Sequence, residues 1–334
     1  MNDPIKPADI EALAAEFNRT VNAARTTLAR AIVGRADIID GMLYGLFGGG
    51  HILIEGAPGL GKTKMALALS QCFGLAFRRI QFTPDVLPMD ITGTPIPVKI
   101  DGGGIEYKFQ AGPLFSNIVL ADEINRAIPK TQSALLEAMQ EGSVTTTIET
   151  LRLPDPFIVI ATQNPIEMEG TFPLPEAQID RFLLKLTIGS ATETELTEIL
   201  RRTTTGETQA LDIVATQARV SEMRVLTRRL PAADSVLEYA SRVVTLTNPD
   251  NDLAPKAVRE YIRYGASPRG AQAMVVAGKV RALLDGRYHL SIDDLRAVAA
   301  PALRHRLILN FNGRASGAST DAIIGDVLSA SDRS

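Results

Sequence analysis

A glycine-rich segment that ends in a lysine and a threonine carries residue types suited to binding phosphate. Residues 56–63 read GAPGLGKT and match the pattern G-x-x-x-x-G-K-[ST], between an apolar run and an expected helix. Glycine lets backbone N–H groups turn toward phosphate oxygens, and the helix start adds a positive partial charge. Lys62 would reach the β- and γ-phosphates, and Thr63 would ligate Mg²⁺. The predicted nucleotide-binding residues here are Gly56, Ala57, Pro58, Gly59, Leu60, Gly61, Lys62, Thr63 and Lys64.

Two adjacent carboxylates follow another apolar run, at residues 117–123. A buried strand that ends in acidic residues directs them at the ligand crevice of an α/β sheet. Asp122 would hold Mg²⁺ through water, and Glu123 would orient the attacking water or take its proton. The alternative is a pair that caps a helix, since Asp favours helix starts.

A third polar group is expected at the same edge. The apolar run 157–161 is followed by Thr162-Gln163-Asn164-Pro165, so Asn164 would project from a strand end and could hydrogen-bond the γ-phosphate and the water. Taken alone, Asn-Pro indicates only a turn. A further apolar run, 77–82, lies between the phosphate loop and the acidic strand. That order, with Glu directly after Asp, favours a protein that hydrolyses nucleoside triphosphates over a nucleoside kinase.

The elements that must position these groups alternate between short apolar runs and helical patterns. Strands are expected at 51–54, 77–82, 118–121, 157–161 and 183–188, and helices at 5–31, 36–47 and 62–73. This rhythm predicts an α/β fold whose parallel sheet is covered by helices on both faces. Two hairpins are expected as insertions, at 96–109 and 144–153. After Gly189 the strand-like runs stop. We expect residues 1–189 to form the core, 190–310 an all-helical second domain, and 311–334 a flexible tail in which 323–328 could form a short helix.

Composition excludes several other classes of protein. Hydrophobic residues make up 45% and the formal net charge is −3, so the chain is neither disordered throughout nor a generally basic binder of nucleic acid or membrane surfaces. Aromatic residues are 5% with no Trp, which disfavours a stacking platform for single strands. The single cysteine, Cys72, fits a reducing compartment. With no apolar leader at the start and no run of about 18 apolar residues, we expect a cytoplasmic protein without a membrane span.

The charges are unevenly distributed along the chain. Residues 1–254 hold 23 Lys and Arg against 31 Asp and Glu, whereas residues 255–306 hold 10 against 4. This basic segment is either a solvated helical face, a nucleic-acid surface, or a face that docks on the acidic core of a neighbouring copy.

Three stretches together resemble the MoxR family of AAA+ ATPases. They are GAPGLGKT, NIVLADEINRAIPKTQSALLEAMQEGSV and FIVIATQNPIEMEGTFPLPEAQIDRF, which lie within residues 30–190. The remainder resembles an AAA+ lid. The resemblance implies a core with a five-stranded parallel sheet, inserted hairpins that line the pore or face of a ring, and a helical lid. One departure is Ile128-Pro129, where family members often carry two prolines.

The resemblance also assigns roles to residues that spacing alone would not. Arg181 matches the arginine finger that reaches the next subunit's nucleotide, a role suited to a permanently charged, bidentate guanidinium. Arg269 resembles the lid arginine that contacts the γ-phosphate of its own subunit's nucleotide. Ile32, Val33 and Gly34 resemble the segment beside adenine, and Arg126 would face the subunit boundary. The alternatives are surface ion pairs for the arginines and ordinary helix packing for residues 32–34.

The function implied is that of an ATP-hydrolysing, Mg²⁺-dependent ring. It would remodel a client protein or insert a metal into it, with a von Willebrand factor A-domain protein as partner and six protomers by family resemblance. One alternative is a magnesium-chelatase-like or helicase-like motor driven by nucleic acid, because those machines share the inserted hairpins. Another is an ATP sensor that assembles without turnover, against which Glu123 argues.

Overall fold

Five parallel strands form the central sheet of the computed structural model, which describes residues 7–99, 104–146, 149–164, 170–204 and 210–333. They are β1 (Ile52–Gly56), β2 (Phe77–Gln81), β5 (Ile118–Asp122), β8 (Ile158–Gln163) and β9 (Leu184–Ile188), in the order β2-β5-β8-β1-β9. The five expected strands are therefore confirmed, as is the parallel sheet. β1 lies between β8 and β9, and β5 lies between β2 and β8. Because all of these pairings are parallel, the segments that follow β1 and β5 leave the same edge of the sheet.

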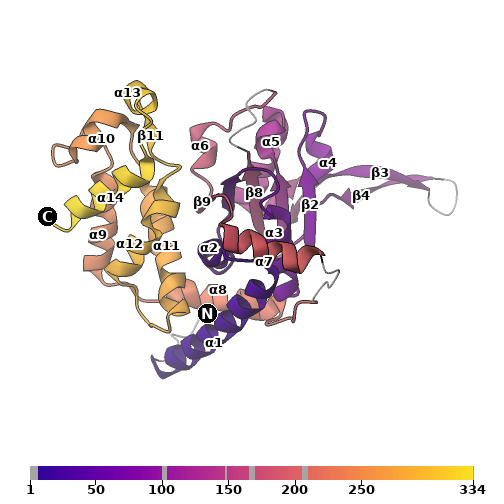
Figure 1. Ribbon diagram of the computed structural model, residues 1–334. Helices are drawn as coiled ribbons and strands as arrows, with labels where there is room; N and C mark the ends of the chain where they lie inside the picture. Colours follow the sequence, from indigo (N-terminus) through magenta and orange to yellow (C-terminus); the bar gives the residue numbers. More distant parts are fainter. Residues whose placement is uncertain (1–6, 100–103, 147–148, 165–169, 205–209, 334) are drawn as a thin grey trace.

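Helices cover both faces of this sheet, as the sequence predicted (Figure 1). One face packs against α1 (Pro7–Ala31), α2 (Ala36–Gly48) and α3 (Lys62–Cys72), with Phe17, Phe47 and Phe73 buried between them. The other face packs against α4 (Pro88–Thr92) and α5 (Pro129–Glu141). Two short elements lie between strands and helices of the core. They are the 3₁₀ turn Ile124–Arg126, which follows β5, and α6 (Glu176–Ile179), which precedes β9.

The helices that follow α8 (Gln217–Arg229) lie beside the core and contact it through α1, α2 and β9, whereas α7 (Glu193–Thr204) lies against the core itself (Figure 1). The expectation that strands are absent after Gly189 is wrong, because Ile262 and Tyr264 pair with Leu309 and Ile308 in a small antiparallel ribbon, β10 (Ile262–Tyr264) and β11 (Ile308–Leu309). These strands are too short to give a periodic signal. The next helices along the chain are α9 (Asp234–Thr245), α10 (Lys256–Tyr261), α11 (Pro268–Leu284) and α12 (Ile292–Leu303).

The end of the chain is ordered, which corrects the expectation of a flexible tail over 311–334. It forms α13 (Phe311–Ala315) and α14 (Thr320–Ser331), and the short helix expected at 323–328 lies within α14. The Ser319 hydroxyl caps α14, and Ile323, Ile324 and Val327 are buried against the neighbouring helices. The Gly, Ala and Ser residues in and around α14 weaken the apolar pattern of this helix, which has only about three turns, so the sequence indicated a tail.

Both expected hairpins are present. The first is β3 (Gly93–Lys99) with β4 (Ile105–Ala111), and the second is β6 (Ser143–Thr145) with β7 (Thr150–Arg152). The expected turn at residues 101–104 falls mostly outside the described residues. The first hairpin projects far from the sheet (Figure 1).

Candidate active site

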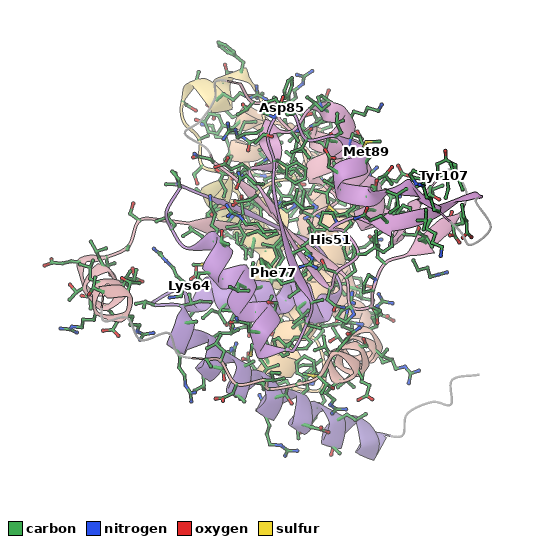
Figure 2. The ribbon with its side chains drawn as sticks, turned by 90° about the vertical axis from the view of Figure 1, so that its right-hand side faces the viewer. His51, Lys64, Phe77, Asp85, Met89 and Tyr107 are labelled. Carbon is green, nitrogen blue, oxygen red and sulfur yellow. The ribbon has the colours of Figure 1, made fainter. Side chains whose placement is uncertain are left out.

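The phosphate loop joins β1 to α3 and has the shape of an anion cradle. Gly59 and Gly61 adopt φ of +83° and +79°, and a Cβ atom at either position would meet no atom within 4 Å. The open space above these glycines therefore fits a phosphate chain, and the α3 N-terminus starts directly at Lys62. The Lys62 ammonium is buried and donates to the Gly56 carbonyl oxygen at 2.7 Å, while Thr63 is half-buried. Lys64, in the first turn of the same helix, is exposed and is labelled in Figure 2.

Asp122 lies at the end of β5 with both carboxylate oxygens engaged. The Thr162 hydroxyl donates to Oδ1 at 2.6 Å, and Arg79 of β2 donates to Oδ2 at 2.7 and 3.1 Å. Thr63 and Asp122 are the oxygen donors that suit a Mg²⁺ ion beside the phosphate loop. In this structure the Arg79 guanidinium balances the negative charge of the Asp122 carboxylate.

Glu123 is held in a strained backbone conformation directly after β5. Its φ is +58°, and it is the one described non-glycine residue with positive φ. The backbone N–H donates to the Thr162 hydroxyl at 2.9 Å, which fixes the turn after β5. Gln81 Nε2 and Arg126 Nη1 each donate to Glu123 Oε2 at 3.0 Å. Backbone strain of this kind persists where surrounding contacts enforce it and is concentrated at functional sites.

Asn164 follows β8 and is buried, next along the sheet from Asp122. The carboxyl edge of the sheet thus brings together the phosphate loop, the two carboxylates and the Asn164 amide, as the sequence predicted.

The segment at residues 32–35 lies near the start of the phosphate loop. Ile32 is buried, and Arg35 donates to the Gly189 carbonyl oxygen just after β9. Gly34 has φ of +71°, and a Cβ there would overlap the Glu195 carboxylate of α7. Val33, Gly34 and the first turns of α7 line a pocket. This placement supports the predicted position beside the base.

Arg181 and Arg269 lie together at the opposite edge of the sheet. Arg181 donates to the Leu136 carbonyl oxygen at 3.3 Å, and the adjacent Asp180 accepts from Arg306 at 2.8 Å and lies 3.7 Å from Arg269. These residues share a pocket with Gly48–His51, the segment that precedes β1. Because β1 has five residues at about 3.3 Å each, about 16 Å of strand separates this pocket from the chain's own phosphate loop.

The structure therefore places Arg269 beside Asp180 and away from its own phosphate loop, and the expected contact of Arg269 with the nucleotide of its own subunit stays a prediction. The lid packs beside the amino edge of the sheet, so it carries Arg269 to Asp180 rather than to the phosphate loop. A motif match places an arginine at the start of α11, but only the packing of α11 on α2 decides which edge it reaches.

Four contact residues escaped the sequence analysis. Arg79 and Gln81 flank the buried Ile80 on β2. The alternation of polar and apolar residues in this expected strand was the sequence signal that could have identified them. Thr162 supports Asp122 and Glu123 from the next strand. Arg306, which is buried, joins the lid to Asp180 and to the carbonyl oxygens of Phe182 and Leu183, and no motif marks it.

Two histidines have structural positions. Burial lowers the pKa of His51 to about 4 and that of His305 well below its ordinary value. His51 Nδ1 accepts from the Val159 N–H at 2.9 Å while Nε2 lies 2.9 Å from the Met139 carbonyl oxygen, so the neutral ring bridges β8 and α5. Both imidazoles are neutral at pH 7.

Comparison with known proteins agrees with this geometry. Residues 51–184 match the family described as ATPase family associated with various cellular activities (AAA), and residues 254–327 match the AAA lid domain. A solved structure of a candidate ATPase from Cytophaga hutchinsonii superposes with a TM-score of 0.89 at 38% identity, over 96% of each chain. The fold and site therefore define a nucleotide-binding AAA+ ATPase with a helical lid.

Relatives with curated names refine this class. The chain is 40% identical to Chaperone MoxR1 of Mycobacterium tuberculosis, over 96% of this chain and 84% of the relative. It is 30% identical to Protein MoxR of Methylorubrum extorquens, over 89% and 88%, and 41% identical to YeaC of Bacillus subtilis, over 90% and 91%. The chain belongs to the MoxR family of AAA+ ATPases. None of the helices in the described residues has the length and apolarity that crossing a bilayer requires.

Proposed function

We propose that copies of this chain assemble head to tail, so that Arg181 and Arg269 of one protomer complete the phosphate site of the next. The observation that carries this proposal is the position of the two arginines at the amino edge of the sheet, about 16 Å of strand away from the protomer's own phosphate loop. A heterologous contact between opposite edges repeats around a ring and closes it. The family resemblance suggests six protomers, and no residue fixes that number.

In this assembly the chain's own residues divide the work of ATP hydrolysis. The phosphate loop and Lys62 bind the phosphates, while Glu123, held by Gln81 and Arg126, and Asn164 orient the attacking water. Thr63 and Asp122 would hold Mg²⁺, which neutralises charge that develops on the phosphates. Arg181 and Arg269 would stabilise the same charge from the neighbour.

The work performed is remodelling of a client protein or its maturation by metal insertion. The named relatives support the chaperone reading, since one of them is called Chaperone MoxR1. A von Willebrand factor A-domain partner follows from the family resemblance alone. Residues 1–254 carry a net negative charge and residues 255–306 a net positive one, so electrostatic attraction would favour contact between these surfaces of neighbouring copies.

Turnover measured against protein concentration tests this proposal. Turnover per protomer should rise with concentration and level off, and the rise should follow the mass seen by light scattering. The transition should move to higher concentration as salt rises, because exposed charges are screened beyond about 8 Å at 0.15 M ionic strength. A chain that remains monomeric at every ATP and salt concentration, with constant turnover, would contradict it.

A further inference from the structure

The hairpin β3–β4 is a two-stranded ribbon attached to the core only at its base. At the base the Phe109 ring lies 5.7 Å from that of Phe115, and Gly93, with φ of +102°, packs so closely that a Cβ would lie 2.3 Å from the Gln110 carbonyl oxygen. Beyond this point the ribbon projects alone, and Tyr107 lies far from the sheet in Figure 2. Two strands alone are marginally stable in water, and among the described strands β3 and β4 pair only with each other, so the outer edge of each is unpaired.

The two outer edges of the ribbon differ in what they can bind. Pro95 lies opposite Phe109 and Pro97 opposite Tyr107. Since proline has no N–H, these two positions suit backbone nitrogens that point away from β4, and the outer edge of β3 lacks donors there. In an antiparallel pair, directly opposite residues share one orientation. The outward N–H and C=O groups of β4 therefore belong to Ile105, Tyr107 and Phe109, and no proline blocks them.

The side chains at the same positions form an exposed apolar face. Ile105 is 66% exposed and Tyr107 63% exposed, and Tyr107 lies across from Pro97. The opposite face carries Glu106 and Lys108, whose charges cancel and whose side chains lie 3.8 Å apart. This surface combines main-chain donors and acceptors with apolar side chains, and its one cation among the described residues is the exposed Lys99, which lies opposite Ile105.

We propose that the outer edge of β4 binds an extended segment of the client polypeptide as a third strand. This inference rests on the proposed function, in which the client is a protein. Groups that repeat every second residue, about 7 Å apart, match the repeat of another strand, whereas a folded helix has no main-chain groups to offer. Main-chain pairing is also tolerant of sequence, with selectivity limited to alternate apolar side chains.

Binding of an unfolded protein by proline variants tests this edge. The probe is fluorescein-labelled, reduced and carboxymethylated lactalbumin, and its affinity is measured by anisotropy with ATP in a Glu123→Gln background. Tyr107→Pro removes an outward donor of β4 and should weaken binding about fivefold, as expected for a hydrogen bond of about 1 kcal/mol. Lys99→Pro adds a proline to the edge that is already blocked and should bind as tightly as Lys99→Ala, which removes the same exposed charge but keeps the N–H. Tyr107→Ala, which keeps the N–H, should retain more affinity than Tyr107→Pro.

The outcomes separate this inference from the proposed ring. In chains that keep Glu123, basal turnover and assembled mass should be the same in the proline variants as in the parent, because the ribbon projects away from the core (Figure 1). Equal affinities for Tyr107→Pro and Lys99→Pro, or no binding of the probe by the parent, would overturn the inference while leaving the ring intact. A fall in assembled mass for Tyr107→Pro alone would show that the edge pairs with a second copy, which would also overturn it.

Discussion

Glu123 illustrates how a single residue depends on its neighbours in three strands. Thr162 of β8 fixes its backbone, Gln81 of β2 and the nearby Arg126 hold its carboxylate, and its own position follows β5. A carboxylate that accepts from two donors is held in a defined direction. This arrangement suits a group that orients water rather than one that binds the nucleotide.

Replacing Glu123 should therefore separate hydrolysis from binding. Glu123→Gln keeps the shape and the backbone bond to Thr162, so ATP affinity should stay within about twofold while turnover falls on the order of 10²–10⁴-fold. Lys62→Ala should weaken nucleotide binding itself. Fluorescent-nucleotide titration and steady-state phosphate release measure the two quantities. Equal loss of affinity in both variants would contradict these roles.

At the scale of elements, the sequence predicts what is local or periodic. The phosphate loop, the acidic strand end and Asn164 could be placed because each follows an apolar run, and parallel strand ends share an edge. The position of Arg269 could not be, since it depends on how α11 packs on α2. The extent of α14 was not predicted for a similar reason, because Ile323 and Val327 stabilise this helix only through the neighbouring helices that bury them.

Asp294 joins two helices of the lid and should contribute strongly to its stability. Its side chain is fully buried and accepts from Arg281 and Arg287 at 2.6 Å, while Ser291 completes the capping box of α12. Asp294→Ala leaves two arginines without their shared acceptor. Because these arginines are about one-third exposed, we expect a loss of about 3 kcal/mol in the free energy of unfolding, below the upper range for buried pairs.

Urea denaturation of the Asp294→Ala variant measures this loss. Asp293→Ala is the matched control, because Asp293 occupies the same helix turn but its side chain is exposed and pairs only with Arg296. Equal stability of the two variants would show that the buried cluster is not important to the lid.

The buried histidines should make the fold sensitive to mild acid. Burial holds the pKa of His51 at about 4, whereas the unfolded chain binds this proton near pH 6.5. The unfolded state therefore gains the proton first, and stability falls as pH drops from about 6.5 toward 4, by up to about 1.4 kcal/mol per pH unit for each such histidine. His305 adds to this loss, since its folded pKa is also lowered.

His51→Gln tests the origin of this acid sensitivity. Glutamine can both accept from Val159 and donate to Met139 but does not titrate, so the dependence of unfolding free energy on pH between 6 and 4.5 should be shallower by about one proton. An unchanged slope in urea titrations at several pH values would assign the acid loss to other groups.

At the scale of the whole molecule, the two half-sites that we propose for one active site lie on opposite edges of one protomer. The phosphate loop, Asp122 and Glu123 occupy the carboxyl edge, and Arg181 and Arg269 occupy the amino edge with Asp180 and Arg306. Under this proposal, a single protomer has each half-site but cannot bring them together. The charge difference between residues 1–254 and 255–306 is consistent with contact between unlike surfaces of neighbouring copies.

Mixing inactive variants tests this division most directly. Lys62→Ala lacks a working phosphate loop, and Arg269→Ala lacks the lid arginine. If Arg269 acts on the neighbour, mixed assemblies contain junctions where an intact phosphate loop meets an intact Arg269, and ATP turnover should recover to a measurable fraction of the parent's. Mixing Lys62→Ala with Glu123→Gln is the control, because both changes lie in the same half-site and no junction is complete. Recovery with Arg269→Ala and none with Glu123→Gln is the predicted result. Absence of recovery with Arg269→Ala, in mixtures shown by mass to co-assemble, would contradict the shared active site.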